Sequence, residues 1–384
     1  MDMTYAAALA ALLVFLASVV SVELALSAAI IEIAAGVVAG NFLGLQPAPW
    51  MDFLAGFGGI LLTFLAGAEV DPGLLKDKLK ESLLIGGFSF LMPYLAAIAY
   101  CYWAAQWTWP AALVAGCALS TTSLAVVYAV LVETGLTDSS IGKILMAATF
   151  VTDMGTALAL SLTFAEWSLH TLWFLVGSAG IIGLVPRYLP RVFERYGARV
   201  IEPEIKGLFF LLFLFMALGK WGQSHAVLPV FVLGLALAPM FQQHKALQRK
   251  LRIVAFAMIT PFFFIKGGMN VSVPDLVEHW QLLLILFGIK TVAKFIGVWP
   301  FAKRYANDHA GYLTLLMSTG LTFGTISSLY GLQAGHLTSS QFSVLVAVVI
   351  ATAIVPTFIA QRWFSPGLPE QIKEEVLAQE EESI

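Results

Sequence analysis

The chain has 384 residues, of which 59% are apolar and only 12% are charged, and its formal net charge is −3. About a quarter of the residues of a soluble protein are charged, so two soluble domains of this total length are excluded. The apolar residues form many separate runs, each about long enough to cross a bilayer as a helix. The strands of a membrane β-barrel are about ten residues long and alternate strictly, which these runs do not. The composition therefore predicts an all-α polytopic membrane protein.

The charge and cysteine content exclude several kinds of partner. The chain has no basic stripe of the kind that binds nucleic acid. Cys101 and Cys117 both fall in apolar runs, which favours two small buried side chains over a disulfide framework or a metal site. We therefore expect neither a cofactor nor a nucleic-acid partner.

About thirteen runs qualify as transmembrane helices. The first has no preceding Lys or Arg, unlike a secretory signal peptide, so we expect it to be retained. The approximate limits of the spans are 4–22, 27–44, 53–69, 81–105, 110–133, 140–166, 168–187, 205–221, 225–241, 250–267, 279–302, 309–334 and 340–362.

The basic residues predict the direction in which the chain crosses the membrane. With the N-terminus outside, seventeen of the twenty-one Lys and Arg residues fall in cytoplasmic segments. Lys220 and Lys266 fall on the outer side, and Lys290 and Lys294 lie within a span. This asymmetry fits the positive-inside rule. We expect a multi-pass protein of the cell inner membrane with an outer N-terminus and a cytoplasmic C-terminus.

Charged side chains in the middle of a span are costly and usually functional. The first in chain order is Glu32, which can be paired in the bundle, pack at a dimer interface or take part in transport. Glu69 and Asp71 follow at the cytoplasmic end of the span 53–69.

Two later spans are interrupted by polar residues, ALSTTSLAVVY at 118–128 and MSTGLTFGTISSLYG at 317–331. Such runs favour helices that unwind at the bilayer centre and form ion sites there, although close packing through small residues is the alternative. We expect Thr121, Thr122 and Ser123 at the first ion site and Thr319, Gly320, Thr322 and Gly324 in the second interrupted helix. Each interrupted span is the middle one of three consecutive spans. The two groups of three lie seven spans apart in the chain, and because seven is odd they cross the membrane in opposite directions, which is an inverted repeat.

Asp153 lies near the centre of the span 140–166, within ATFVTDMGTALAL. A carboxylate there can hold a proton or a small cation but not both easily, which is the minimum that an exchanger needs. The alternative is a structural carboxylate paired permanently with a lysine. Thr152 adds a hydroxyl oxygen, the kind of ligand that hard cations prefer. We therefore predict that Asp153 is the site of Na+ or K+ binding.

The segment 186–206 is the longest polar stretch between spans, and we interpret it as a cytoplasmic amphipathic linker. Its basic residues would also attract anionic lipid.

Lys290 and Lys294 follow in the span 279–302, one turn apart and able to share a helix face. A buried ammonium group needs a counter-charge, for which Asp153 is the obvious candidate, and cation binding there would release a proton from the lysine. For Lys290, packing or snorkelling is equally open.

Seven stretches together resemble a known family, the second subfamily of monovalent cation:proton antiporters. It includes bacterial Na+/H+ antiporters and glutathione-gated potassium efflux systems. The stretches occur in family order over nearly the whole chain and are GFGGILLTFLAGAEVDPGLL (56–75), ALSTTSLAVVYAVLVETGL (118–136), FVTDMG (150–155), ITPFFFIKGGMNV (259–271), KFIG (294–297), STGLTFGTISSLYGL (318–332) and LTSSQFSVLVAVVIATAIVPTF (337–358).

The resemblance implies a sodium/proton antiporter fold in a homodimer, with a mobile core that carries the ion across by an elevator movement. Asp153 matches the family's ion-binding aspartate, and Lys294 its core lysine. The implied division is 1–75 as mostly dimerisation scaffold, 76–166 as the first core triple, 167–267 as linker helices and scaffold, 268–363 as the second core triple, and 364–384 as an acidic cytoplasmic tail.

The chain departs from the family at three places. Many relatives have Asp, Asn or Gln where this chain has Thr152, and two adjacent carboxylates often accompany two protons per cation, so one carboxylate leaves the stoichiometry open. Ile31 stands where a Gly usually precedes the glutamate. No nucleotide-binding domain follows the last span, so we do not expect glutathione-type gating.

Three other functions are alternatives to exchange, and each has its own requirement. A sodium-coupled organic-anion symporter would require sodium without proton counter-flow. An intramembrane aspartyl protease would need a second aspartate in a facing span, and a non-transporting sensor would move no ions. Carboxylate and hydroxyl oxygens suit both Na+ and K+, and of the two we favour Na+.

Overall fold

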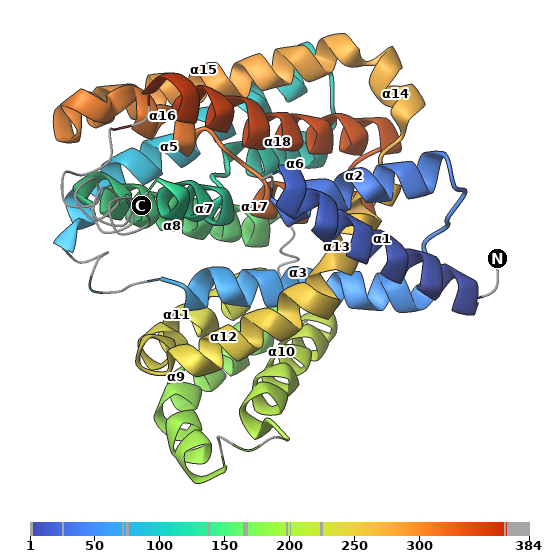
Figure 1. Cartoon of the computed structure of the whole chain (residues 1–384), viewed down its shortest axis with the longest axis vertical. Coiled ribbons are helices and arrows are strands. Elements are labelled where there is room, and N and C mark those ends of the chain that lie inside the picture. Colours follow the sequence, from blue (N-terminus) through green and yellow to red (C-terminus); the bar gives the residue numbers. More distant parts are fainter. Residues whose placement is uncertain are drawn as a thin grey trace, which may run out of the picture.

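The computed structural model describes residues 3–24, 27–70, 73, 77–134, 136, 139–163, 168–196, 199, 201–222, 226–364 and 366. All regular elements in these ranges are helices (Figure 1). The first half contains α1 (Met3–Leu24), α2 (Ala28–Asn41), α3 (Pro49–Ala68), α5 (Leu79–Ala99) with η1 (Tyr100–Ala104), α6 (Trp109–Ser120), α7 (Leu124–Glu133), α8 (Ser140–Thr163) and α9 (Leu169–Tyr196). The second half contains α10 (Pro203–Trp221), α11 (Val227–Gln243), α12 (Lys245–Val254), η2 (Ala255–Ile259), α13 (Thr260–Met269), α14 (Val273–Glu278), α15 (Trp280–Tyr305), η3 (Asn307–His309), α16 (Ala310–Met317), α17 (Thr322–Gln333), α18 (Ser339–Ile359) and η4 (Ala360–Phe364).

The predicted spans correspond one by one to helices or to pairs of half-helices. In the described ranges, eight helices are long and apolar enough to cross a membrane, and three more apolar helices are shorter. The spans 110–133 and 309–334 are the broken pairs α6–α7 and α16–α17. The prediction of an all-α membrane bundle with two interrupted helices is therefore confirmed.

The segment 186–206, predicted as an amphipathic linker, is largely helical. Helix α9 continues through Pro186 and Pro190 to Tyr196, and α10 already begins at Pro203. The last two turns of α9 contain Arg191 and Arg195, which lower their hydropathy, so the continuous apolar run ends before the helix does. The short helix α14 lies in a segment for which no helix was predicted.

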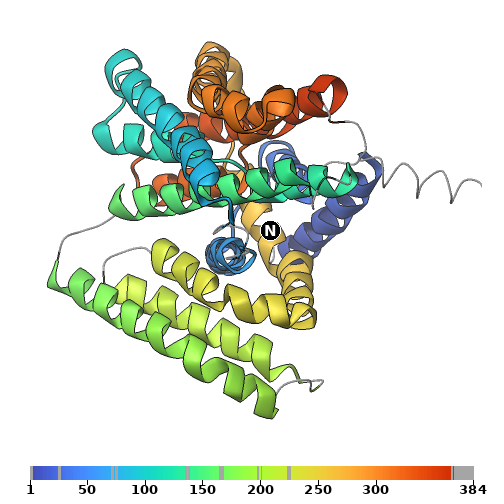
Figure 2. The ribbon, with the colours of Figure 1, turned by 90° about the vertical axis from the view of Figure 1, so that its left-hand side faces the viewer.

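The helices pack into two groups; in Figure 1, α3 and α9–α12 of the second group lie below the first group, and α1 and α2 lie beside it. The broken-helix group consists of α5–α8 and α15–α18, with α5 packed against α6, α8 and α15. The flanking group consists of α1–α3 and α9–α13, with α3 packed against α11 and α13. Figure 2 shows α9–α12 as a layer below the rest of the molecule.

Glycines allow the closest approaches between helices. A Cβ atom at Gly86 of α5 would collide with the Ala148 carbonyl oxygen of α8. On another side of α5, a Cβ atom at Gly297 of α15 would lie 2.6 Å from the Phe88 carbonyl oxygen. Small residues let membrane helices approach backbone to backbone in this way. As a result α5 holds α8 and α15 close together, and these two helices carry the buried aspartate and the two buried lysines.

Candidate ion-binding site

The site is built around two breaks in the helical backbone. Helix α6 ends at Ser120, and the extended residues Thr121–Ser123 separate it from α7. Helix α16 ends at Met317, and residues 318–321 separate it from α17. Hydroxyl groups satisfy part of the freed backbone, because Ser120 donates to the Cys117 carbonyl and Thr319 to the Leu316 carbonyl.

Hydrogen bonds join the two breaks directly. The Thr122 hydroxyl donates to the Met317 carbonyl oxygen over 2.9 Å, and the Ser123 N–H donates to Thr319 Oγ1 over 3.4 Å. Both bonds are buried and connect residues more than 190 positions apart in the chain. The breaks therefore meet at one point, which we call the crossing.

The predicted residues of the second interruption divide between the break and the following helix. Thr319 and Gly320 lie in the break, whereas Thr322 and Gly324 belong to the first turn of α17. A Cβ atom at Gly320 would collide with Lys290 Nζ and lie 2.7 Å from Thr121 Oγ1. Gly320 thus lets the lysine reach the crossing.

Asp153 lies on α8 with 3% of its surface exposed, and Thr152 beside it is fully buried. The Thr152 hydroxyl donates to the Thr149 carbonyl over 2.6 Å, which leaves its oxygen lone pairs free to face a ligand. The charges of Lys294 and Glu69 both act on Asp153. Asp71, the other acidic residue predicted near this end of α3, lies outside the described residues.

Lys294 is held by oxygen atoms from three elements. Its ammonium nitrogen donates to Ser89 Oγ on α5, to the Ser120 carbonyl oxygen at the end of α6, and to Thr122 Oγ1 in the break, over 2.8 to 2.9 Å. Ser89 was missed in the sequence, where its only signal is a single hydroxyl in an apolar span.

The expected ion pair between Lys294 and Asp153 is not formed, because the three hydrogen bonds hold the ammonium group elsewhere. Among the described residues, the ion pairs are Lys78–Glu81, Lys250–Glu202, Arg252–Glu69 and Lys266–Asp52. The carboxylate of Asp153 is thus buried within reach of the charge of Lys294 but is not neutralised by direct contact with it.

Lys290 is fully buried one turn before Lys294, and its nitrogen has no hydrogen-bond partner among the described residues. The two ammonium groups also act on each other. The carbonyl ends of α6 and α16 meet near these groups, and the partial negative charge of a helix C-terminus favours a cation there.

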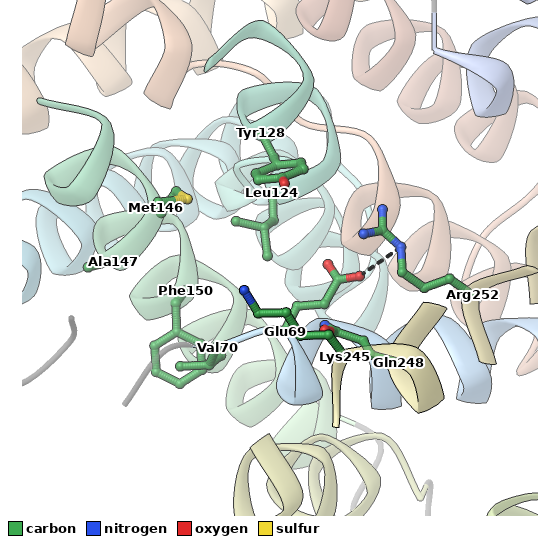
Figure 3. A pocket seen from close by; sticks show the side chains of 10 residues that line it. All are labelled: Glu69, Val70, Leu124, Tyr128, Met146, Ala147, Phe150, Lys245, Gln248 and Arg252. Carbon is green, nitrogen blue, oxygen red and sulfur yellow. Dashed lines mark ion pairs between the residues drawn. The ribbon is translucent and has the colours of Figure 1, made fainter. Parts of the chain in front are cut away.

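A cavity of about 290 Å³ lies at the end of α3 (Figure 3). Glu69 and Arg252 face each other across it, with a distance of 3.4 Å between Glu69 Oε1 and Arg252 Nε. Its lining consists of Glu69, Val70, Leu124, Tyr128, Met146, Ala147, Phe150, Lys245, Gln248 and Arg252. Because it is bordered by α7 and α8 on one side and by α3 and α12 on the other, it lies between the two helix groups.

The side chains of Asp153, Thr152 and the break at 121–123 offer only oxygen ligands, from one carboxylate and hydroxyl groups. No group of three or more His, Cys, Asp or Glu side chains that could hold a metal ion occurs among the described residues. Such a set of oxygens suits a hard cation of low charge.

Comparisons with known proteins agree with this geometry. Residues 8–365 match the family model described as "Sodium/hydrogen exchanger, transmembrane". The probable Na+/H+ antiporter 3 of Methanocaldococcus jannaschii is 27% identical over 357 residues, which cover 85% of this chain and 89% of that protein. Cation/H+ antiporter 17 of Arabidopsis thaliana is 25% identical over 339 residues, which cover 83% of this chain but 41% of that longer protein.

Among solved structures, the sodium proton antiporter MjNhaP1 from Methanocaldococcus jannaschii superimposes with a TM-score of 0.67 at 15% identity, over 95% of this chain and 100% of that one. This likeness shows a shared fold. The family model extends over nearly all of the described helices, including both breaks and the helices that carry Asp153 and the two lysines. The chain is therefore an integral multi-pass membrane protein that belongs to the transmembrane sodium/hydrogen exchanger family.

Proposed function

We propose that this protein is a secondary antiporter that exchanges Na+, or alternatively K+, for protons at Asp153. One observation carries the proposal: the buried carboxylate of Asp153 is acted on by the charge of Lys294, which is bonded to the crossing, and it forms no ion pair among the described residues. A carboxylate in that position is neutralised either by a proton or by a cation. The names of the relatives as Na+/H+ and cation/H+ antiporters support the same exchange.

The cation is bound by Asp153 together with hydroxyl oxygens of Thr152, Thr121, Thr122 and Ser123. Thr121, Thr122 and Ser123 belong to the break, and all four residues are at most 1% exposed. Protonation of Asp153 removes the charge that holds the cation, so the two ligands exclude each other. This mutual exclusion couples the two fluxes without any cofactor.

Lys294 positions the crossing, because its three hydrogen bonds tie the end of α6 and the break to α5. Lys290 supplies a second positive charge next to Gly320. Together they offset the negative ends of the half-helices while Asp153 is occupied by a proton.

Transport follows an elevator movement in which the broken-helix group is the mobile core and the flanking group is the scaffold. The packing supports this division, since most close backbone contacts lie within a group. The inferred division of the chain into 1–75, 76–166, 167–267, 268–363 and 364–384 differs from these groups at residues 268–269, which end α13 of the flanking group.

The scaffold forms a homodimer within the inner membrane, with the N-terminus outside and the C-terminus in the cytoplasm. The sparse burial of α1 and α9, 22% and 17% over their apolar windows, supports this arrangement. Such faces are covered either by lipid or by a second copy.

The test uses purified protein in liposomes that contain a proton-sensitive dye, with Na+, K+ and Li+ added in turn. Wild-type protein moves protons in response to at least one cation, and Asp153→Asn abolishes this movement while the protein remains folded and inserted. The dependence on membrane potential gives the stoichiometry. Exchange that survives in Asp153→Asn would remove Asp153 from the mechanism, and sodium-dependent transport without proton movement would favour a symporter.

A further inference from the structure

The cavity between the two helix groups contains a carboxylate to which the proposed exchange gives no role. Of the ten residues that line it, only Glu69 is acidic, whereas Lys245 and Arg252 are basic. Glu69 directly follows α3 in the flanking group, and a quarter of its side-chain surface is exposed. A cation that enters this cavity therefore meets one negative group.

Arg252, the ion-pair partner of Glu69, can be displaced from the carboxylate. Arg252 Nε lies 3.4 Å from Glu69 Oε1, and 45% of the arginine side chain is exposed. Ion pairs with this much solvent access contribute little free energy. A free cation can therefore compete with the guanidinium group for the carboxylate at low cost.

The cavity leads toward Asp153. Its wall on α8 includes Met146 and Phe150, which lie seven and three positions before Asp153 and so share one face of the helix with it. The charge of Glu69 acts on Asp153, so the two carboxylates are electrostatic neighbours. Phe150 is buried, lines the cavity and lies one turn before Asp153 on α8.

We propose that Glu69 captures the monovalent cation in this cavity before it passes to Asp153, and that Arg252 is a tethered competitor which occupies Glu69 when no cation is present. The inference rests on the proposed exchange at Asp153. It adds an entry site on the scaffold side of the pathway.

A purely structural role of the Glu69–Arg252 pair can be distinguished from competition between Arg252 and the cation. If the pair only joins α3 to α12, loss of either partner breaks the same contact and has the same effect. If Arg252 competes with the transported cation, loss of Glu69 weakens cation capture whereas loss of Arg252 strengthens it. The direction of the two effects therefore separates the alternatives.

The experiment measures proton exchange in everted membrane vesicles, whose accessible side is the face on which the cavity opens, as a function of Na+ and, in parallel, K+ concentration. Glu69→Gln is expected to raise the half-saturating cation concentration by about two- to fivefold, and Arg252→Gln to lower it by a similar factor, the range that corresponds to an exposed ion pair. Glu69→Asp keeps the charge and is expected to lie close to the wild type, which provides a second variant if the glutamine protein folds poorly.

Two matched controls involve charged residues of α12 or their ion-pair partners. Glu202→Gln breaks the ion pair between Glu202 and Lys250, which joins α12 to the start of α10 outside the cavity, and should leave the half-saturating concentration unchanged. Lys245→Gln removes a positive charge from the cavity without touching the Glu69–Arg252 pair, and its effect should be smaller than that of Arg252→Gln.

Shifts of the same sign in Glu69→Gln and Arg252→Gln, or no shift in Glu69→Gln, would overturn the inference, as would equal effects of Lys245→Gln and Arg252→Gln. Asp153→Asn is measured beside them. If Asp153→Asn abolishes exchange while Glu69→Gln leaves the half-saturating cation concentration unchanged, only the entry site is rejected. If Asp153→Asn retains exchange, the proposed function itself is rejected.

Discussion

Lys290 and Lys294, one turn apart on α15, differ in their hydrogen bonds although both are lysines in the same apolar span. Lys294 donates three hydrogen bonds, whereas Lys290 donates none to any described residue. Both are fully buried. Burial of an ammonium group is costly unless hydrogen bonds or opposite charges compensate it. The two residues should therefore contribute to stability with opposite signs.

This contrast predicts the effect of replacing each lysine by methionine, which keeps the length of the side chain. Lys294→Met leaves the oxygens of Ser89, Ser120 and Thr122 without their donor and should lower the free energy of unfolding by about 1–3 kcal/mol. Lys290→Met removes a charge that has no partner and should leave the thermal unfolding temperature unchanged or raise it. Unfolding of both variants in detergent is measured by intrinsic fluorescence. A Lys294→Met protein as stable as the wild type would show that the three hydrogen bonds do not hold the crossing together.

At the scale of whole elements, α2 and α13 are locked together by facing glycines. A Cβ atom at Gly268 of α13 would collide with the Ile33 carbonyl oxygen of α2, and one at Gly36 would collide with the Ile265 carbonyl oxygen. These obstacles are backbone atoms, which cannot turn away as the end of a side chain can. The neighbouring Gly267 faces the Thr325 side chain, where a Cβ atom would make an ordinary contact at 3.5 Å.

Gly268→Ala should therefore force the two helices apart and destabilise the protein by several kcal/mol, in the upper range for overpacking. Gly267→Ala, one position away in the same helix, should be neutral or slightly stabilising because alanine favours the helix. The folded yield after extraction and the unfolding temperature measure both effects. Equal stability of the two variants would contradict the backbone packing described here.

At the scale of the whole molecule, aromatic side chains connect the two helix groups. Phe150 of α8 stacks on Phe231 of α11 with 5.7 Å between the ring centroids. Phe231 also meets Phe323 of α17 edge-on at 6.1 Å. An interface along which two groups slide must not be fixed by hydrogen bonds, and these aromatic contacts contain none.

An elevator movement predicts that a covalent link across this interface stops transport. Phe150→Cys combined with Phe231→Cys, joined by oxidation or by a short bifunctional reagent, should abolish cation-driven proton movement, and a reductant should restore it. The control links Phe57 of α3 to Phe213 of α10, which stack at 4.3 Å within the flanking group. Full exchange in the protein linked between Phe150 and Phe231 would exclude the elevator movement.

The sequence by itself determined the membrane class, the succession of spans and the two helix breaks. These properties are local: an apolar run must bury its backbone polar groups in a helix, and clustered Ser, Thr and Gly residues offer the backbone other partners. Asp153 and the two lysines were found for the same reason, since a charge within an apolar run is visible without any fold. The end of α9 was missed, because helix ends depend on neighbours in space.

Only the tertiary structure decided how the charges are satisfied. The hydrogen bond from Lys294 to Ser89 joins residues 205 positions apart, so no periodicity predicts it. The same holds for the pair of Glu69 with Arg252, which lines a cavity formed by four different helices. The energy of a buried charge depends on the few atoms within hydrogen-bond distance. Those atoms come from distant parts of the chain, and only their packing into one bundle brings them together.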